Sequence, residues 1–279
     1  MGLPGGDWLR TIDFLADRFP TVQPEVWLQR MQDGLVLDEQ AQPVLPDAAY
    51  RPHTRLYYYR HLAEEPRIPF EYTLLFQDAH LVAVDKPHFL PTVPGGRYVQ
   101  ETVLVRLKQA LGLDSLAPLH RLDRETAGVT LFCIHPAERD AYHALFRQHQ
   151  VHKTYEAIAP WRTELPPLRR SRIVQSEPFF RYCEAPGEAN AETHIGLLET
   201  LGEWARYQLS PTTGRTHQLR IHMAALGIPI RNDHWYPELV AVADGDFSAP
   251  LQLLARSIAF TDPITGQARQ FSSSRLLKV

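Results

Sequence analysis

The sequence predicts an α+β fold, in which a small N-terminal α/β module precedes a larger domain with a mainly antiparallel mixed sheet flanked by helices and loops. Three observations support this prediction. The chain has 279 residues, enough for one large domain or two unequal ones. Helical spacing of apolar residues marks its first part, whereas short apolar runs between turn residues dominate the remainder. Hydrophobic residues make up 44% and charged residues 22%, which excludes a disordered or fibrous protein.

The N-terminal module is expected over residues 1–65. Its first helical pattern ends at Pro20, and Pro24 suits the first turn of a second helix that Gly34 would end. The stretch 63–69 combines acidic residues with two prolines and is the best candidate for a linker. Helices are therefore expected at 7–20 and 25–31, and short strands at 35–37 and 55–59.

The larger domain is expected over residues 70–279. Turn-forming residues at 262–266 predict a hairpin between its last two strands, and residues 85–96 are typical of a turn-rich loop. Helices are expected at 101–111 and 137–148. Strands are expected at 81–84, 129–134, 155–159, 193–199, 205–209, 217–221, 253–261 and 268–271.

The composition restricts the class of protein. The formal net charge is −3, so any grip on nucleic acid or on an anionic membrane must come from a local patch. The N-terminus lacks the unbroken apolar core of a signal peptide, and the longest apolar runs are too short to span a bilayer. The only cysteines, Cys133 and Cys183, are expected to be reduced thiols. We therefore expect a cytoplasmic protein without a membrane segment.

The first motif that suggests a chemical role surrounds Asp123. Arg121 and Arg124 flank this acid in a polar turn, just before a strand that Gly128 lets the chain enter sharply. Neighbouring arginines keep a carboxylate ionised, and an ionised carboxylate at the mouth of a strand can act as a nucleophile or stabilise positive charge. Taken alone, the same pattern is more typical of a surface ion pair.

The second motif covers residues 213–222. Gly214 suggests a turn, and the residues after it are expected to form a strand. His217 and His222 would then lie on opposite faces, so a shared metal site is not expected. Alternation would place His217, Leu219 and Ile221 on one face, and Gln218, Arg220 and His222 on the other.

A third candidate is Tyr155, which opens the strand after the helix at 137–148. A tyrosine there could stack on a flat ring or transfer a proton. Taken alone, it is more typical of a packing aromatic in a strand.

Together, these pieces resemble the RluA-type pseudouridine synthases. The motifs that carry the resemblance are HRLDRETAG (120–128), KTYEAI (153–158) and TGRTHQLRIHM (213–223). Weaker matches at 82–95 and 253–260 extend it from about residue 72 to the C-terminus, with all motifs in the family's order.

The resemblance implies a pseudouridine synthase fold and an enzyme that converts a uridine within RNA to pseudouridine. The uracil leaves C1′ of the ribose through N1, turns, and is joined again through C5, with no cofactor and no metal. Flipping of the target base is expected, since a stacked uracil is out of reach. Asp123 matches the family nucleophile; whether it attacks C1′ or uracil C6, or acts by another route, stays open.

The same resemblance implies roles for further residues. Arg220 matches the arginine that pairs with the catalytic aspartate, and Tyr155 the aromatic that packs on the target base. Arg121 matches the residue that enters the RNA where the uridine has left. The expected substrate-binding residues are Arg121, His120, Leu219, Ile221 and Arg215. The chain departs from the family pattern at Ala127, at the variable position Glu125, and at His88 and Phe89, where altered contact with substrate could result.

Residues 11–44 and 50–60 resemble the alpha-L RNA-binding module that often precedes this catalytic domain. Between residues 7 and 60, however, six arginines stand against eight acids, a net charge of −2, where an RNA-binding module should be basic. Whether this module binds RNA stays open. A better basic patch is expected at Arg169, Arg170 and Arg172, in a predicted hairpin loop over 162–172 that could equally be solvated.

The expected partner is RNA, either ribosomal or transfer RNA, with no obligate protein partner and a monomeric state. One alternative is an RNA-binding or RNA-folding protein that has lost catalysis, which the intact set of Asp123, Tyr155 and Arg220 disfavours. Another is a glycosidase, but Glu125 is too near Asp123 in sequence to be a convincing second carboxylate.

Overall fold

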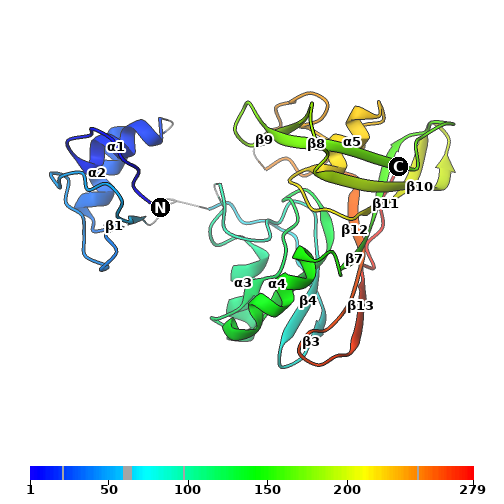
Figure 1. The fold of residues 1–279 in the computed structure, drawn as a ribbon, viewed down its shortest axis with the longest axis horizontal. Coiled ribbons are helices and arrows are strands. Elements are labelled where there is room, and N and C mark those ends of the chain that lie inside the picture. Colours follow the sequence, from blue (N-terminus) through cyan, green and yellow to red (C-terminus); the bar gives the residue numbers. More distant parts are fainter. Residues whose placement is uncertain (21, 59–64, 97, 244) are drawn as a thin grey trace. The chain divides into compact units, whose positions relative to one another are not determined.

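The computed structural model describes residues 1–20, 22–58, 65–96, 98–243 and 245–279, and the chain divides into two compact units, Met1–Glu64 and Glu65–Val279 (Figure 1). In the first unit, Phe14 and Leu15 of one helix pack with Trp27 and Met31 of the next. Part of the predicted strand at 55–59 and of the predicted linker lies outside the described residues. The elements of this unit are α1 (Thr11–Arg18), α2 (Pro24–Gln32), β1 (Val36–Leu37) and β2 (Tyr57–Tyr58).

The second unit carries the remaining elements. Its helices are α3 (Val103–Leu111), α4 (Arg139–Arg147), preceded by the 3₁₀ turn η1 (Pro136–Glu138), and α5 (Gln218–Ala225). Its strands are β3 (Thr73–Gln77), β4 (Leu81–Lys86), β5 (Ala117–Pro118), β6 (Ala127–Cys133), β7 (His152–Pro160), β8 (Leu168–Ser176), β9 (Arg181–Ala185), β10 (Ala191–Leu201), β11 (Trp204–Pro211), β12 (Leu253–Thr261) and β13 (Ala268–Ser272).

Within the described residues these strands form one sheet in the order β3-β4-β6-β12-β7-β11-β10-β8-β9, with β13 beside β12 and β5 beside β6. Every pairing is antiparallel except that of β6 with β12, which confirms the predicted mainly antiparallel mixed sheet. Successive side chains of β4 enter opposite cores, so α4 packs on one face of this strand and α3 on the other.

The predicted strand at 217–221 is wrong, because residues 218–221 belong to the helix α5 and His217 is the residue that precedes its first turn. Residues 218–223 are all buried, so the helix is covered on every side and shows no amphipathic period. The alternation of polar and apolar residues there imitated a strand. His217 and His222 consequently do not lie on two faces of a strand.

The predicted loop over 162–172 is also wrong in its second half, since β8 begins at Leu168. Arg169 and Arg170 of this strand form ion pairs with Glu184 and Glu192, and Arg172 donates to a backbone carbonyl. The three arginines are therefore held within the sheet and do not form a free basic loop.

The linker is shorter than predicted. Ile68 is fully buried in the core formed with α3, and Glu65 accepts backbone hydrogen bonds from Val99, Gln100 and Glu101. Residues 65–69 are thus part of the second unit. None of the described helices is both long enough and apolar enough to cross a membrane.

Gly128 brings β6 close to β12 rather than serving as a turn before the strand. Its φ is +115°, and a Cβ atom at this position would lie 2.2 Å from the carbonyl oxygen of Ala255. Only glycine permits this close backbone approach. The parallel contact of β6 with β12 sets where the loop before β6 lies.

We predict that Gly128→Ala lowers the free energy of unfolding by about 3 kcal/mol or more, because the added methyl group must displace backbone. Gly112→Ala is the matched control: φ there is +65°, yet no atom lies within 4 Å of the new Cβ. It should cost only about 1 kcal/mol. Urea unfolding of both variants measures the difference, and equal losses would show that the contact with Ala255 is unimportant.

Candidate active site

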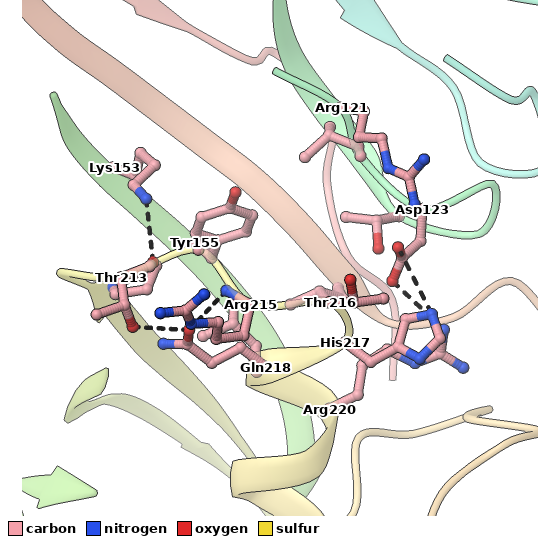
Figure 2. A pocket seen from close by; sticks show the side chains of 16 residues that line it. Arg121, Asp123, Lys153, Tyr155, Thr213, Arg215, Thr216, His217, Gln218 and Arg220 are labelled. Carbon is pink, nitrogen blue, oxygen red and sulfur yellow. Dashed lines mark hydrogen bonds and ion pairs between the residues drawn. The ribbon is translucent and has the colours of Figure 1, made fainter. Parts of the chain in front are cut away.

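Asp123 lies at the mouth of a small cavity of about 150 Å³, between the loop that leads into β6 and the start of α5. Tyr155 of β7 lines the facing wall, and its strand pairs with β12 (Figure 2). The carboxylate of Asp123 is 29% exposed, so it meets both solvent and the cavity. A cavity of about 150 Å³ is the size that takes up a single six-membered ring.

A buried arginine lies between two carboxylates at the cavity. Arg220 of α5 is 1% exposed, and its Nε and Nη2 atoms donate to the two carboxylate oxygens of Asp233 at 2.8 and 2.7 Å. Its Nη1 lies 3.5 Å from Oδ2 of Asp123. Burial alone would lower the pKa of Arg220, but the hydrogen bonds and charge of Asp233, with the charge of Asp123, raise it overall. The guanidinium therefore stays charged beside Asp123.

Two further groups adjoin this arrangement. Oε2 of Glu125 is buried without a hydrogen-bond partner and lies 3.5 Å from Nη2 of Arg220. Nε2 of His217 lies 3.8 Å from Oδ1 of Asp123, and its Nδ1 is 2.9 Å from the hydroxyl of Tyr236. Burial lowers the pKa of His217, which keeps this ring neutral near pH 7. With its proton on Nε2, facing Asp123, the ring of His217 would accept at Nδ1 from the Tyr236 hydroxyl, which itself accepts from the Tyr182 amide.

The loop that carries Asp123 has no regular secondary structure and is braced by the segment after β4. Nζ of the buried Lys86 donates to the carbonyl oxygen of Arg124 at 3.1 Å, and burial lowers the pKa of Lys86 to about 7. The ring of His88 lies 2.7 Å from the carbonyl oxygen of Glu125. The hydroxyl of Thr92 bonds both backbone groups of Leu122. Backbone groups on both sides of Asp123 are thus fixed by side chains.

The start of α5 is fixed in a similar way. The side-chain amide of Gln218 donates to Glu192 and Thr193 on β10, and its oxygen accepts from Thr213 and Arg215 (Figure 2). One turn later, His222 bridges the hydroxyls of Ser171 and Thr193. These contacts lock α5, and with it Arg220, against the sheet.

The environment of Tyr155 favours a protonated phenol. Its pKa is raised, first by burial and then by the charge of Asp123. Beside it, Nζ of Lys153 donates to the carbonyl oxygen of Thr213, and burial lowers the pKa of Lys153. Tyr155 therefore offers the cavity a flat ring and a hydroxyl that keeps its proton at neutral pH.

Of the five residues expected to bind substrate, three line the cavity and two lie outside it. Arg121, Leu219 and Arg215 line the cavity, and Arg121 has no ion-pair partner among the described residues. Nε of Arg215 donates to the backbone of Asn190. His120 lies outside the lining: its Nε2 accepts from the Leu131 amide, and burial lowers its pKa to about 3. Ile221 also lies outside it, packed in a core with Ile173, Ala191 and Tyr236.

Sequence reasoning missed Asp233, His217 and Gln218 as parts of this arrangement. Asp233 follows α5 in a segment, residues 231–236, for which no element was predicted. The acid next to an aromatic pair was a local signal, but nothing in the sequence linked it to Arg220. His217 and Gln218 were placed on a strand, which concealed that a helix begins here beside Asp123, with His217 as its N-cap and Gln218 as its first residue.

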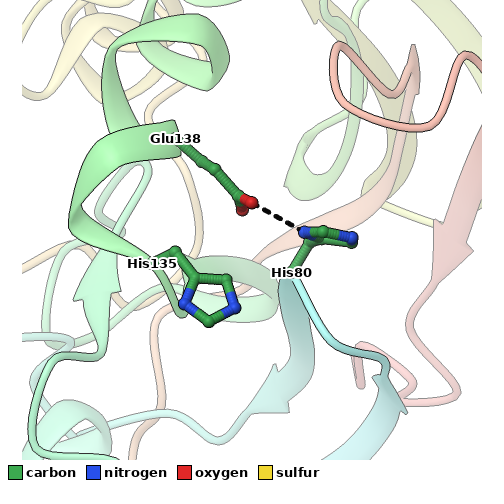
Figure 3. A group of neighbouring side chains, drawn as sticks. All are labelled: His80, His135 and Glu138. Atoms are coloured by element: carbon green, nitrogen blue, oxygen red, sulfur yellow. Dashed lines mark hydrogen bonds and ion pairs between the residues drawn. The ribbon is translucent and has the colours of Figure 1, made fainter.

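Outside the cavity, one group of described residues has the ligand types of a metal site. Nitrogen atoms of His80 and His135 and an oxygen of Glu138 lie within 4.8 Å of one another (Figure 3). His80 precedes β4 and His135 follows β6, so the seven residues of β6, roughly 20 Å, separate this cluster from the loop of Asp123. It therefore has no part in the cavity around Asp123.

Comparisons with known proteins agree with this geometry. The family model described as RNA pseudouridylate synthase matches residues 80–225. An uncharacterized RNA pseudouridine synthase of Synechocystis sp. is 31% identical over 231 residues, covering 81% of this chain and 78% of that protein. The dual-specificity RNA pseudouridine synthase RluA of Haemophilus influenzae is 33% identical, covering 72% of this chain and 91% of that protein.

The chain belongs to the RluA family of RNA pseudouridine synthases. This confirms the resemblance that its motifs carry, and it makes the protein an isomerase that acts on RNA. The solved human RNA pseudouridylate synthase domain containing 4 has a TM-score of 0.56 at 25% identity, covering 74% of this chain and 88% of that one. Domain containing 1 shares the fold, with a TM-score of 0.60 at 20% identity, covering 76% and 86%. The likeness of the N-terminal module to alpha-L modules stays a prediction.

We predict that Asp233→Ala lowers the free energy of unfolding by about 3 kcal/mol, because it strands the buried guanidinium of Arg220. Glu199→Ala serves as the matched control, since it breaks the half-exposed ion pair of Glu199 with Arg206. That change should cost less than about 1 kcal/mol. Equal losses in urea unfolding would argue against the buried pair as a structural anchor.

We also predict that the free energy of unfolding decreases as the pH is lowered, because of His222. Burial lowers the pKa of this fully buried histidine to about 4, whereas the unfolded chain binds a proton near pH 6.5. Between about pH 4 and 6.5 the unfolded state therefore binds more protons at His222 than the folded state does. The stabilising contribution of the neutral His222 is complete above about pH 6.5 and is lost as the pH falls towards 4. Between about pH 7 and pH 4.5, the free energy of unfolding should fall less for His222→Gln than for the wild type. The control His152→Gln, at an exposed histidine, should lose as much as the wild type.

Proposed function

We propose that this RluA-family enzyme isomerises specific uridines in structured ribosomal or transfer RNA, with Asp123 as nucleophile and after flipping of the target base. The observation that carries the proposal is the arrangement at the cavity: a partly exposed carboxylate beside a buried, permanently charged guanidinium, at the mouth of a space sized for one ring. Arg220 orients the carboxylate of Asp123, since its Nη1 faces that carboxylate while its other two nitrogens are held by hydrogen bonds to Asp233.

The chemistry requires three events at the base. The bond from C1′ to N1 breaks, the uracil turns, and C5 bonds to C1′ while the C5 proton is lost and N1 gains one. An ionised carboxylate can form a transient covalent bond at C1′ or at C6, or stabilise positive charge on the sugar. No atom is gained or lost overall, so the cavity must hold the uracil while it is detached.

The other groups have supporting roles in this proposal. Tyr155 supplies a flat surface for the uracil, and its protonated hydroxyl can donate a hydrogen bond. Thr213, Gly214 and Arg215 close the cavity opposite Asp123. Arg121 is exposed and has no ion-pair partner among the described residues, so its guanidinium is available to fill the space that a flipped uridine leaves in RNA.

The test uses RNA labelled with tritium at uracil C5, because isomerisation breaks the C5–H bond and releases the label to water. Total RNA from cells lacking the gene supplies unmodified sites, and mapping of pseudouridine identifies them. Release by the wild-type enzyme at discrete sites supports the proposal. No release from either ribosomal or transfer RNA, with RNA binding retained, would favour an RNA-binding protein without catalysis.

We predict that Asp123→Asn lowers the rate of tritium release by at least about 10³-fold. Because Arg220 keeps its two bonds to Asp233, the variant should fold with a nearly unchanged melting temperature. Asp114→Asn, which alters an exposed aspartate outside the cavity, is the control and should retain wild-type activity. Near-normal turnover by Asp123→Asn would rule out the nucleophile assignment.

A further inference from the structure

A larger cavity of about 820 Å³ continues from Asp123 towards the surface. It shares Asp123, Arg121, His217 and Arg220 with the small cavity, and it extends over the β8–β9 hairpin and the segment after α5. Its outer wall carries Phe179, Phe180, Trp235, Val240 and Val242. The rim of the active site therefore contains far more apolar surface than its catalytic centre.

The outermost of these side chains is unusually exposed. Phe179 is 74% exposed, and Val240 and Val242, which line the same cavity, are 55% and 40% exposed. Exposed apolar side chains that gather at the rim of a cavity mark a surface that binds a ligand. The fold gains little from the ring of Phe179, since most of that ring stays in contact with water.

A continuous series of aromatic rings joins Phe179 to the catalytic centre. Ring centroids lie 5.7 Å apart between Phe179 and Phe180, 5.1 Å between Phe180 and Trp235, and 5.0 Å between Trp235 and His217. The guanidinium of Arg220 lies 5.0 Å from the Trp235 ring. Phe180, Trp235 and His217 each contact at least two other rings, whereas Phe179 contacts only Phe180 among the described rings.

The hairpin that carries Phe179 is held firmly. The backbone amide of Tyr182 donates to the hydroxyl of Tyr236 at 3.0 Å, and Arg181 donates to the carbonyl oxygen of Pro237 at 2.9 Å. Both acceptors belong to the segment that follows Asp233 and Trp235. The position of Phe179 relative to Asp123 is therefore set by the elements that hold Arg220.

The charges of this cavity favour a nucleic-acid occupant. Three arginines line it, Arg121, Arg124 and Arg220, against the two carboxylates of Asp123 and Glu125. Cationic side chains next to exposed aromatic rings are the pattern that binds single-stranded nucleic acid, in which arginines meet phosphates and rings stack on bases. A flipped target uridine must bring its neighbours to this rim, because they are joined to it by the same backbone.

We propose that Phe179, supported by Phe180, is a stacking site for an unpaired nucleobase that flanks the target uridine. The ligand is a nucleotide of an RNA loop or bulge, because a base within a duplex has both faces covered. The site rests on the proposed function and narrows its substrate to uridines that have at least one unpaired neighbour.

The experiment measures KM and kcat of the full-length enzyme by tritium release, on a short RNA containing one mapped site. Phe179→Ala should raise KM by about 5- to 100-fold and leave kcat within about twofold, since stacking acts in binding. Phe179→Trp, which keeps an aromatic ring at this position, should have a KM close to that of the wild type. Leu276→Ala is the matched control, because Leu276 is likewise 74% exposed and lies outside the cavity.

A second arm removes the base instead of the ring. An abasic residue is placed in turn on each side of the target uridine. At the position whose base stacks on Phe179, it should raise KM of the wild type but should not raise KM of Phe179→Ala any further. An unchanged KM for Phe179→Ala on purified RNA would overturn the stacking site and point to a protein as the occupant of this rim. A loss confined to kcat would overturn it as well. Failure of the proposed function is distinct, since the wild-type enzyme itself would then release no tritium.

Discussion

The buried pair of Arg220 and Asp233 is the interaction on which the rest of the active site depends. Asp233 engages two nitrogens of a guanidinium that is 1% exposed, and so compensates the cost of burying its charge. That geometry leaves Nη1 directed at Asp123, so the pair also orients the carboxylate that we propose as the nucleophile. Because Arg220 stands on α5 and Asp233 on the segment that follows, the contact also fixes the path of the chain after the helix. A buried pair of this kind is a weak source of stability but a strong constraint on geometry.

A second constraint is the support of a loop that has no secondary structure of its own. The carbonyls of Leu122, Arg124 and Glu125 are satisfied by Thr92, Lys86 and His88. His88 departs from the family pattern, and the structure turns its ring inward onto this loop. The unusual residue there therefore helps to hold the loop that carries Asp123.

That rim links the catalytic centre to the substrate. Trp235 lies between the guanidinium of Arg220 and the ring of Phe180, so the groups that hold Asp123 also position the exposed aromatic surface. Binding of a nucleobase at Phe179 would thus be transmitted to α5 through packed rings rather than through a mobile loop. This gives a physical reason for an RluA-family enzyme to recognise unpaired RNA beside its target.

The sequence by itself determined the family and the α+β class, and it singled out Asp123, Tyr155 and Arg220 as candidate site residues, because these depend on residue types at fixed local spacing. The mainly antiparallel sheet also followed from local patterns, since its half-exposed strands alternate. Only the tertiary structure decided that residues 218–225 form a helix, because burial on all sides removes the periodicity by which a helix is recognised. It likewise decided that Asp233 holds Arg220, that His120 and Ile221 lie outside the cavity, and that Phe179 stands at its rim. Each of these depends on contacts between segments far apart in the chain, which no local pattern records.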